Sequence, residues 1–222
     1  MASSLAYRPR GLRDRQKLAR ERRIVRAATR LFVRGGYSAT AMEEVAAAAG
    51  LAVGTIYNYF PSKPDLLLAI VRRETEEMVA SARGILAAPP ANPIAAIIAM
   101  IDLWFDGFMS DDRVLWRELL AAAVAEPSGI GQRLFELDVR LVVVLTELIE
   151  QLKARGVIAP ELDAMRAATV VYAIALTWIN AWMLSEMVTA SMAREEIHRG
   201  IEIACNGILN KSNTRAARRG KQ

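Results

Sequence analysis

Apolar residues near the start of the chain recur at spacings of three, four and seven, with arginines largely between them. The apolar positions of this segment are Leu18, Ile24, Val25, Ala28, Leu31 and Phe32. This period places them on one face of a helix, so the pattern predicts an amphipathic helix from about Gln16 to Arg34. Residues 1–15 lack the period, and we expect them to form a basic flexible arm.

Two short helices joined by a glycine turn are predicted over Thr40–Phe60. The spacing Thr40-x-x-Glu43 is that of a capping box, which predicts a helix from Thr40 to Ala49. Gly50 can adopt the left-handed conformation that ends such a helix. The next helix is expected over about Ala52–Tyr59.

Six further helices follow from apolar periodicity and from helix-start residues. Ser62-x-x-Asp65 predicts a start near Lys63, Asn92-Pro93 predicts a second, and Asp111 or Asp112 a third. The expected ranges are 63–86, 92–109, 111–125, 127–155, 163–187 and 191–210. No alternating strand pattern is present, so the predicted fold is all-α, with about nine helices. We expect a helix-turn-helix domain over 16–62, a larger helical domain over 63–210, and a basic flexible tail over 211–222.

Composition is consistent with this organisation, and charge adds a polarity to it. The chain has 222 residues, of which 53% are hydrophobic, so it can bury a substantial core. Residues 1–64 hold 12 Lys and Arg against 4 Asp and Glu, whereas residues 65–210 hold 12 against 20. A basic first part on an acidic body suits contact with phosphates through one end. The single cysteine and the lack of a secretory leader predict a cytoplasmic protein.

Catalytic chemistry has little support in the sequence. His198 and Cys205 are the only residues of their kinds and lie two helical turns apart, which excludes a catalytic pair and an ordinary zinc site. No phosphate-binding loop or nucleotide fingerprint is present. We therefore expect no enzyme activity, cofactor or metal, with His198 at the surface and Cys205 buried.

The helix predicted over Ala52–Tyr59 has a face that suits a DNA groove. Ile56 and Phe60 share one side and are expected to face the core. The opposite side and its flanks carry Gly54, Thr55, Tyr57, Asn58 and Tyr59. An asparagine pairs well with adenine, and Lys63 suits a phosphate. An ordinary helical hairpin, with tyrosines that simply cover a core, fits the same pattern.

The segment GYSATAMEEVAAAAGLAVGTIYNYFPSKPDLL resembles the DNA-binding region of the tetracycline-repressor (TetR) family. The resemblance lies in Gly36-Tyr37, Thr40, Val45 to Gly50, Gly54-Thr55-x-Tyr57-x-Tyr59-Phe60, Ser62-Lys63 and Leu66-Leu67. It implies base-facing positions at Val53, Gly54, Thr55, Tyr57 and Asn58. It implies contacts with the DNA backbone at Thr40, Tyr59 and Lys63. Ala52 and Pro64 depart from the family pattern, in which a capping serine and a glutamate are common.

An uncharged stretch over Ala167–Ser185 is long enough for a membrane span, but its polar residues and its soluble-looking neighbours favour a buried helix. The family resemblance implies that the last two helices form a four-helix bundle with a second copy of the chain. The expected interface residues of this homodimer are Trp178, Asn180, Trp182, Ile201 and Cys205.

Large apolar and aromatic side chains gather in the middle of the chain. They are Met100, Trp104, Phe105, Phe108, Trp116, Leu119, Phe135 and Tyr172. Such a set is usually plain core, but the family resemblance implies an effector pocket in this region, and these walls favour an apolar or aromatic molecule. The sequence thus predicts a dimeric, ligand-responsive transcriptional regulator, a repressor of a double-stranded DNA operator, with no membrane partner. The alternatives are a membrane-surface protein or a small-molecule carrier.

Overall fold

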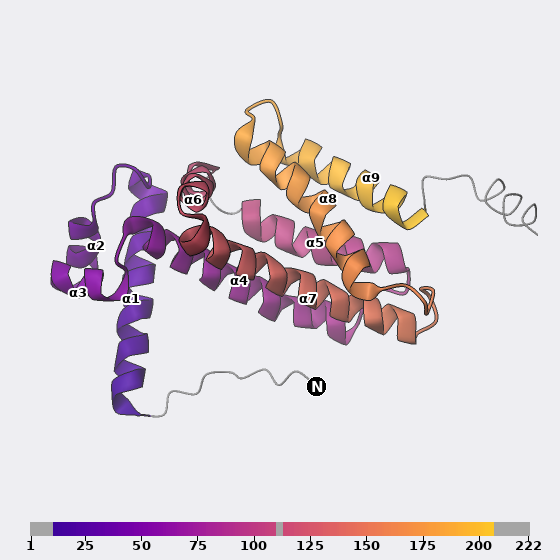
Figure 1. The fold of residues 1–222 in the computed structure, drawn as a ribbon, viewed down its shortest axis with the longest axis horizontal. Coiled ribbons are helices and arrows are strands. Elements are labelled where there is room, and N and C mark those ends of the chain that lie inside the picture. The colour runs from indigo at the N-terminus through magenta and orange to yellow at the C-terminus, as the bar shows by residue number, and fades with distance from the viewer. Residues whose placement is uncertain (1–10, 110–112, 207–222) are drawn as a thin grey trace, which may run out of the picture. The chain divides into compact units, whose positions relative to one another are not determined.

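The structure is a computed structural model that describes residues 11–109 and 113–206 (Figure 1). Helices form throughout this part of the chain, and no strand occurs in it, which confirms the all-α prediction. The elements are α1 (Leu12–Gly35), α2 (Met42–Ala49), α3 (Val53–Tyr59), α4 (Lys63–Ala87), α5 (Pro93–Met109), α6 (Arg113–Ala125), a π-helical turn (Pro127–Gly131), α7 (Gln132–Ala154), α8 (Ala164–Leu184) and α9 (Ala190–Asn206).

The chain divides into two compact units. The first unit contains residues up to 73 together with 112–133, and the second contains 74–111 and 134 onward. The division falls inside α4, about ten residues beyond the boundary expected at 62/63. It also assigns α6 to the first unit, whereas the sequence placed this helix in the larger domain.

In the first unit, α1 buries the stripe that its period predicts. Ile24, Val25, Ala28 and Phe32 are each at most 5% exposed, and they form the core with residues of α2 and α3. The helix begins at Leu12 rather than at Gln16, so residues 12–15 belong to it and not to a flexible arm. Residues 12–20 are exposed or half-buried, which is why apolar periodicity missed this start. The predicted arm over 1–10 lies outside the described residues.

The predicted capping box at Thr40 is wrong by one residue. Ala41 is the N-cap of α2, and its backbone N–H donates to the Glu44 carboxylate at 2.8 Å. The Thr40 hydroxyl instead donates to the Gly36 carbonyl oxygen at 2.9 Å. Two adjacent glutamates made both registers possible, and the burial of Thr40 decides between them.

Other predicted helix ends agree closely with the structure. Gly50 has a φ of 59° and a ψ of 44°, the left-handed conformation that ends α2. Ser62 accepts a hydrogen bond from the Asp65 backbone N–H at 3.2 Å at the start of α4. Asn92 Oδ1 accepts from the Ile94 and Ala95 backbone N–H groups and caps α5. The predicted start at Asp111 or Asp112 lies outside the described residues.

The long helix predicted over 127–155 is interrupted at its start. A π-helical turn occupies Pro127–Gly131, with the Gly131 N–H bonded to the Glu126 carbonyl oxygen at 3.1 Å. A Cβ at Gly131 would lie 2.8 Å from the Ala123 carbonyl oxygen, so the close packing of this turn depends on glycine. Helix α7 begins after this turn, at Gln132.

The second unit is built around α5, α7, α8 and α9, and α8 contributes eight buried residues to its core. In Figure 1, α5 and α9 run beside α8. The end predicted at 187 was too late, since α8 ends at Leu184, where Ser185 is extended. The end predicted at 210 for the last helix lies outside the described residues. By length and hydropathy alone α8 would also pass for a membrane span, a test that core helices pass as well.

The left-handed glycine at the end of α2 gives a prediction about stability. Gly50→Ala should lower the free energy of unfolding by about 1 kcal/mol, because a Cβ is disfavoured at this φ. The matched control is Gly84→Ala, at an exposed helical position of α4 where an added Cβ has open space. It should raise stability by up to about 1 kcal/mol. Urea unfolding measures the change in the free energy of unfolding for each variant. A change of the same sign in both would contradict the left-handed conformation assigned to Gly50.

Candidate DNA-reading surface and effector region

Helix α3 divides its residues between a buried side and an exposed side, as the sequence predicts. Ile56 has no exposed surface and Phe60 is 6% exposed. Gly54, Tyr57 and Asn58 are exposed, while Val53, Thr55 and Tyr59 are half-buried beside them. A Cβ built on Gly54 would meet nothing within 4 Å, so the backbone is open to close approach there.

Lys63 is held beside this surface by an aromatic ring and a carbonyl group. Its Nζ lies 4.4 Å from the centroid of the Tyr37 ring and donates to the Ser38 carbonyl oxygen at 3.2 Å. Partial burial lowers the pKa of Lys63, and the charges of Glu118 and Glu44 act against this lowering. An ammonium has three donors, so the amine keeps hydrogen-bonding capacity for a phosphate.

Tyr37 is a positioning residue that sequence reasoning named only as part of a motif. Its ring is 7% exposed and meets the Phe32 ring edge-on, with centroids 5.1 Å apart. Burial, with a smaller contribution from Glu118, raises the pKa of Tyr37 to about 12. Glu118 of α6 also accepts a hydrogen bond from the Ser38 hydroxyl at 2.7 Å. The signal in the sequence was the aromatic residue directly after Gly36.

The structure turns Thr40 away from the position expected for a DNA contact. The residue is 6% exposed, and its hydroxyl is bonded to the Gly36 carbonyl oxygen. Its role in this structure is to fix the loop between α1 and α2. Because Lys63 donates to Ser38 in the same loop, Thr40 supports the predicted phosphate contact at Lys63 rather than providing one.

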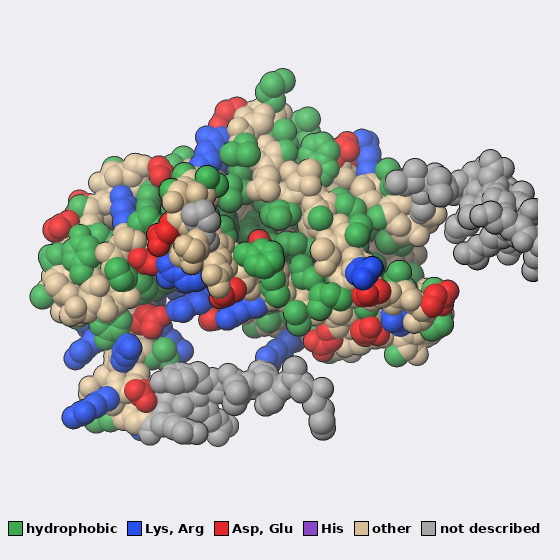
Figure 2. Space-filling view, viewed as in Figure 1, with side chains coloured by type: hydrophobic (Ala, Val, Ile, Leu, Met, Phe, Trp, Pro, Cys, Tyr) green, Lys and Arg blue, Asp and Glu red, His purple; other side chains and the backbone are tan. Residues whose placement is uncertain are grey.

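Basic side chains line α1 on the same unit. The helix carries nine Lys and Arg against two acidic residues, and they gather at the lower left of Figure 2. Two of its charges are used locally, since Arg23 donates to the Gly50 carbonyl oxygen at 3.5 Å and Glu21 pairs with Arg72 at 2.6 Å. A hollow of about 570 Å³ also lies on α1, beside Ala48 of α2.

The residues expected to line an effector pocket do not all come together. Met100, Trp104, Phe105, Phe108 and Tyr172 are buried in the second unit, at 7% exposure or less. Trp116 and Leu119 are buried in the first unit. Phe135 is 65% exposed on α7, so it lines no interior site in this chain. The helical period placed Phe135 correctly on α7. It did not show which face of α7 the other helices cover.

A half-buried acid, Asp138, lies beside one of these aromatic residues, and sequence patterns did not point to it. The Tyr172 hydroxyl donates to Asp138 Oδ1 at 2.7 Å, which joins α8 to α7. Burial raises the pKa of Asp138, and the hydrogen bond from Tyr172 acts against this rise. The Tyr172 ring also meets the Trp104 ring edge-on, with centroids 6.5 Å apart.

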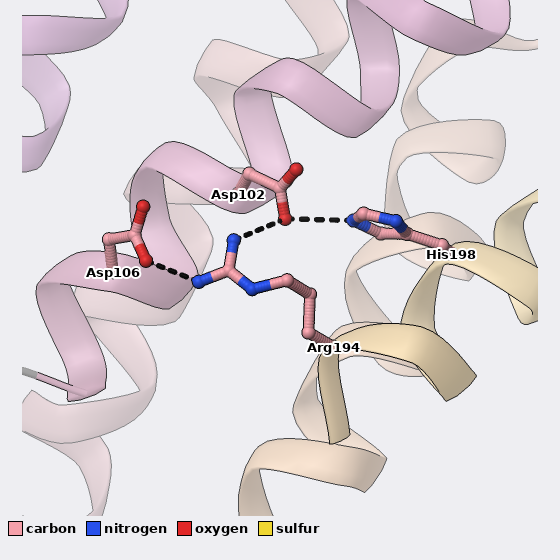
Figure 3. Close-up of polar contacts among 4 residues, drawn as sticks. All are labelled: Asp102, Asp106, Arg194 and His198. Carbon is pink, nitrogen blue, oxygen red and sulfur yellow. Dashed lines mark hydrogen bonds and ion pairs between the residues drawn. The ribbon is translucent and has the colours of Figure 1, made fainter. Parts of the chain in front are cut away.

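Helices α5 and α9 are joined by a group of four charged or titratable side chains (Figure 3). Arg194 Nη1 donates to Asp102 Oδ1 at 2.9 Å, and its Nη2 donates to Asp106. His198 Nε2 lies 2.8 Å from the same Asp102 oxygen. His198 was predicted at the surface; its ring is one-third exposed, and it is also bonded to α5. Asp102 and Asp106 face Arg194 rather than the interior.

The residues expected at a dimer interface differ in their exposure within one chain. Trp182 and Ile201 are buried by their own chain, at 6% and 0% exposure, so they support the bundle from inside. Trp178 and Asn180 are half-buried. Cys205 is exposed, against the prediction that it is buried, because it lies near the end of α9 beyond the last buried residue, Ile201.

Comparison with known proteins agrees with this architecture. Residues 24–70, which hold the α1–α3 core and the start of α4, match the model of "Bacterial regulatory proteins, tetR family". The repressor KstR of Rhodococcus jostii is 28% identical over 166 residues, 74% of this chain and 73% of that protein. The activator FasR of Mycolicibacterium smegmatis is 32% identical over 106 residues, 46% of this chain and 48% of that protein.

A solved structure shows the same fold over most of the chain. The TetR-family repressor FadR of Thermus thermophilus, in complex with lauroyl-CoA, superposes with a TM-score of 0.72 at 21% identity. The match covers 86% of this chain and 96% of that one. The fold and the α3 surface define a helix-turn-helix DNA-binding regulator. Residues 24–70 place the N-terminal part of the chain in the tetR family of bacterial regulatory proteins.

The half-buried Asp138 gives a prediction about pH. The pKa of Asp138 is raised in the folded chain, so its ionisation destabilises the fold as pH rises from near 3.8 through the raised value. Asp138→Asn keeps an acceptor for Tyr172 but carries no charge. The free energy of unfolding of Asp138→Asn, relative to that of the wild type, should therefore increase across this pH range. Above the range the difference should become constant.

Urea unfolding at a series of pH values measures this gain. The control is Glu147→Gln, at an exposed position of the same helix. A gain that is the same for both substitutions, or a gain that shrinks as pH rises, would contradict the assignment of Asp138.

Proposed function

We propose that the chain is a homodimeric transcriptional repressor that binds a palindromic DNA operator and is released by an apolar or aromatic small molecule. Its DNA-binding domain lies in the first unit, and its effector and dimer domain lies in the second. Each subunit places α3 in the major groove of one half-site. Effector binding shifts the population towards a dimer whose two α3 helices no longer match two half-sites. The protein works in the cytoplasm and has no enzyme activity.

The DNA-reading role is carried by the exposed side of α3. Gly54, Tyr57 and Asn58 face solvent while Ile56 and Phe60 anchor the helix. An asparagine side chain donates to and accepts from the adenine edge, which gives base discrimination. Lys63 lies in the same unit and is suited to bind a phosphate. Such a contact sets the register of α3 on the duplex.

The effector role is supported by the interior of the second unit. Met100, Trp104, Phe105 and Phe108 form an apolar and aromatic wall along α5, and Tyr172 adds a ring from α8. The FadR structure of the same fold is a complex with lauroyl-CoA, a ligand with a long apolar chain. KstR, which aligns over most of its length, is a repressor.

The homodimer is supported by an apolar face of α8 that its own chain leaves open. Val170, Ala173, Thr177 and Leu184 are exposed and recur at spacings of three, four and seven, so they lie on one side of the helix. Val170 is 53% exposed and Leu184 is 69% exposed. A continuous apolar helix face of this kind is suited to packing against a second copy.

Base reading and phosphate binding can be separated with two substitutions. An operator is first selected from a random DNA pool, and binding to it and to single-base variants is then measured at several salt concentrations. Asn58→Ala should reduce discrimination at one base pair by about 1–3 kcal/mol. Lys63→Ala should weaken binding to all sequences alike and reduce the salt slope by about one.

The control for the lysine is Arg83→Ala, which removes an exposed cation from the second unit. It should leave both the affinity and the salt slope unchanged. If Asn58→Ala left the ranking of operator variants intact, the assigned groove face would be wrong.

The dimer can be tested on the open face of α8. Val170→Glu places a charge where a second copy is expected, so sedimentation should show monomers, and operator affinity should fall at least tenfold, about 1.4 kcal/mol. Val143→Glu makes the same change at a position of α7 with similar exposure, 49%, and should leave the dimer intact. Dimers that persist in Val170→Glu would place the interface elsewhere.

A further inference from the structure

The indole nitrogen of Trp104 is a buried donor that has no partner. The residue lies on α5 and is 2% exposed, and its Nε1 makes no hydrogen bond within the described chain. Buried donors in native proteins nearly always have a partner, and leaving one unpaired costs about 1–3 kcal/mol. A tryptophan in such a place is unusual, because phenylalanine supplies a ring without this cost.

The unpaired donor is close to the other polar feature of this interior. The Trp104 ring meets the Tyr172 ring edge-on, and the Tyr172 hydroxyl is bonded to Asp138. Three helices, α5, α7 and α8, thus bring the tryptophan with the unpaired N–H and a half-buried carboxyl group next to one tyrosine. Polar groups that carry such costs gather at binding sites more often than in plain core.

The surroundings also indicate the charge of the missing partner. Met100 and Phe105 of α5 are at most 1% exposed, so the interior near Trp104 is apolar. Burial raises the pKa of both Asp138 and Tyr172, which shows that this region disfavours negative charge. A carboxylate brought to the indole would meet the same penalty, together with repulsion from Asp138. A neutral oxygen would not.

We propose that Trp104 Nε1 binds the effector, by donating a hydrogen bond to an uncharged carbonyl oxygen on an otherwise apolar molecule held between α5 and α8. The inference rests on the proposed function as a small-molecule-responsive regulator and names the chemistry of its effector. Tyr172 is kept by Asp138 with its hydroxyl turned to α7, so it offers its ring to the same molecule. The carbonyl oxygen is the hydrogen-bond acceptor that Trp104 Nε1 lacks within the described chain.

Matched probes of equal shape test the hydrogen bond directly. Acetophenone, propiophenone and butyrophenone are compared with ethylbenzene, propylbenzene and butylbenzene, in which a methylene group replaces the carbonyl. Benzoate tests the exclusion of charge. Binding to the full-length protein is measured by calorimetry. At least one ketone should bind about fivefold more tightly than its hydrocarbon, as one net hydrogen bond predicts, and benzoate should not bind.

Substitution shows whether Trp104 makes that bond. Trp104→Phe should remove the preference for the ketone and leave hydrocarbon affinity within about twofold. Trp116→Phe, at a buried tryptophan of the first unit, is the matched control and should keep the preference. The proposal is overturned if no ketone binds, if ketone and hydrocarbon bind equally to the wild type, or if the preference survives in Trp104→Phe.

An NMR measurement keeps the test independent of how Trp104→Phe folds. The chain has four tryptophans, so its ¹⁵N–¹H spectrum should contain four indole signals, and variants of the other three assign the fourth to Trp104. The ketone, but not the hydrocarbon, should move this signal downfield. A signal that does not move on ketone binding would overturn the proposal.

Operator binding separates this inference from the proposed function. If a ketone binds through Trp104 but leaves operator affinity unchanged, the effector response is wrong and the site stands. If a probe releases the operator equally well from the wild type and Trp104→Phe, the function stands and the assignment of Trp104 is wrong.

Discussion

The burial of Ile56 and Phe60 is the constraint on which the DNA-reading surface depends. Helix α3 has only seven residues, far fewer than the roughly 12–15 that an isolated helix needs to be even marginally stable in water. It also lacks a side-chain cap, because its N-cap is Ala52. Its shape therefore comes from packing on α1 and α2. The same packing fixes which residues remain outside, so stability and the choice of reading residues have one cause.

The loop before α2 shows how the first unit holds a cation with an aromatic ring and a carbonyl oxygen. Thr40 closes the loop from inside, Tyr37 supplies a ring, and Ser38 supplies a carbonyl oxygen to Lys63. A ring and a carbonyl group orient the ammonium without removing its positive charge, on which Glu118 and Glu44 also act. An ion pair at that nitrogen would have neutralised the charge that a phosphate needs.

Local patterns predicted those parts of the fold that depend on neighbours in sequence. The spacing of Ile24, Val25, Ala28 and Phe32 gave the buried face of α1, and Gly50 gave the end of α2. The start of α2 was misplaced because adjacent glutamates fit two registers. The Tyr172–Asp138 bond and the Asp102–Arg194–His198 contacts were not predictable, since they join residues 34, 92 and 96 positions apart. Periodicity shows that a position lies on a helix, but not which helix faces it.

The two units differ in how their buried polar groups are satisfied, and this difference bears on function. In the first unit the buried Thr40 has a partner within its own loop, so this part of the fold is complete without any other molecule. In the second unit the indole N–H of Trp104 is unpaired, and its ring contacts Tyr172, which is bonded to the half-buried Asp138. A regulator needs one part that keeps its shape on DNA and another whose most favourable state includes a ligand. A molecule that pairs with the indole N–H removes the free-energy cost of leaving this donor unpaired. It therefore binds more tightly to the conformation that contains the site.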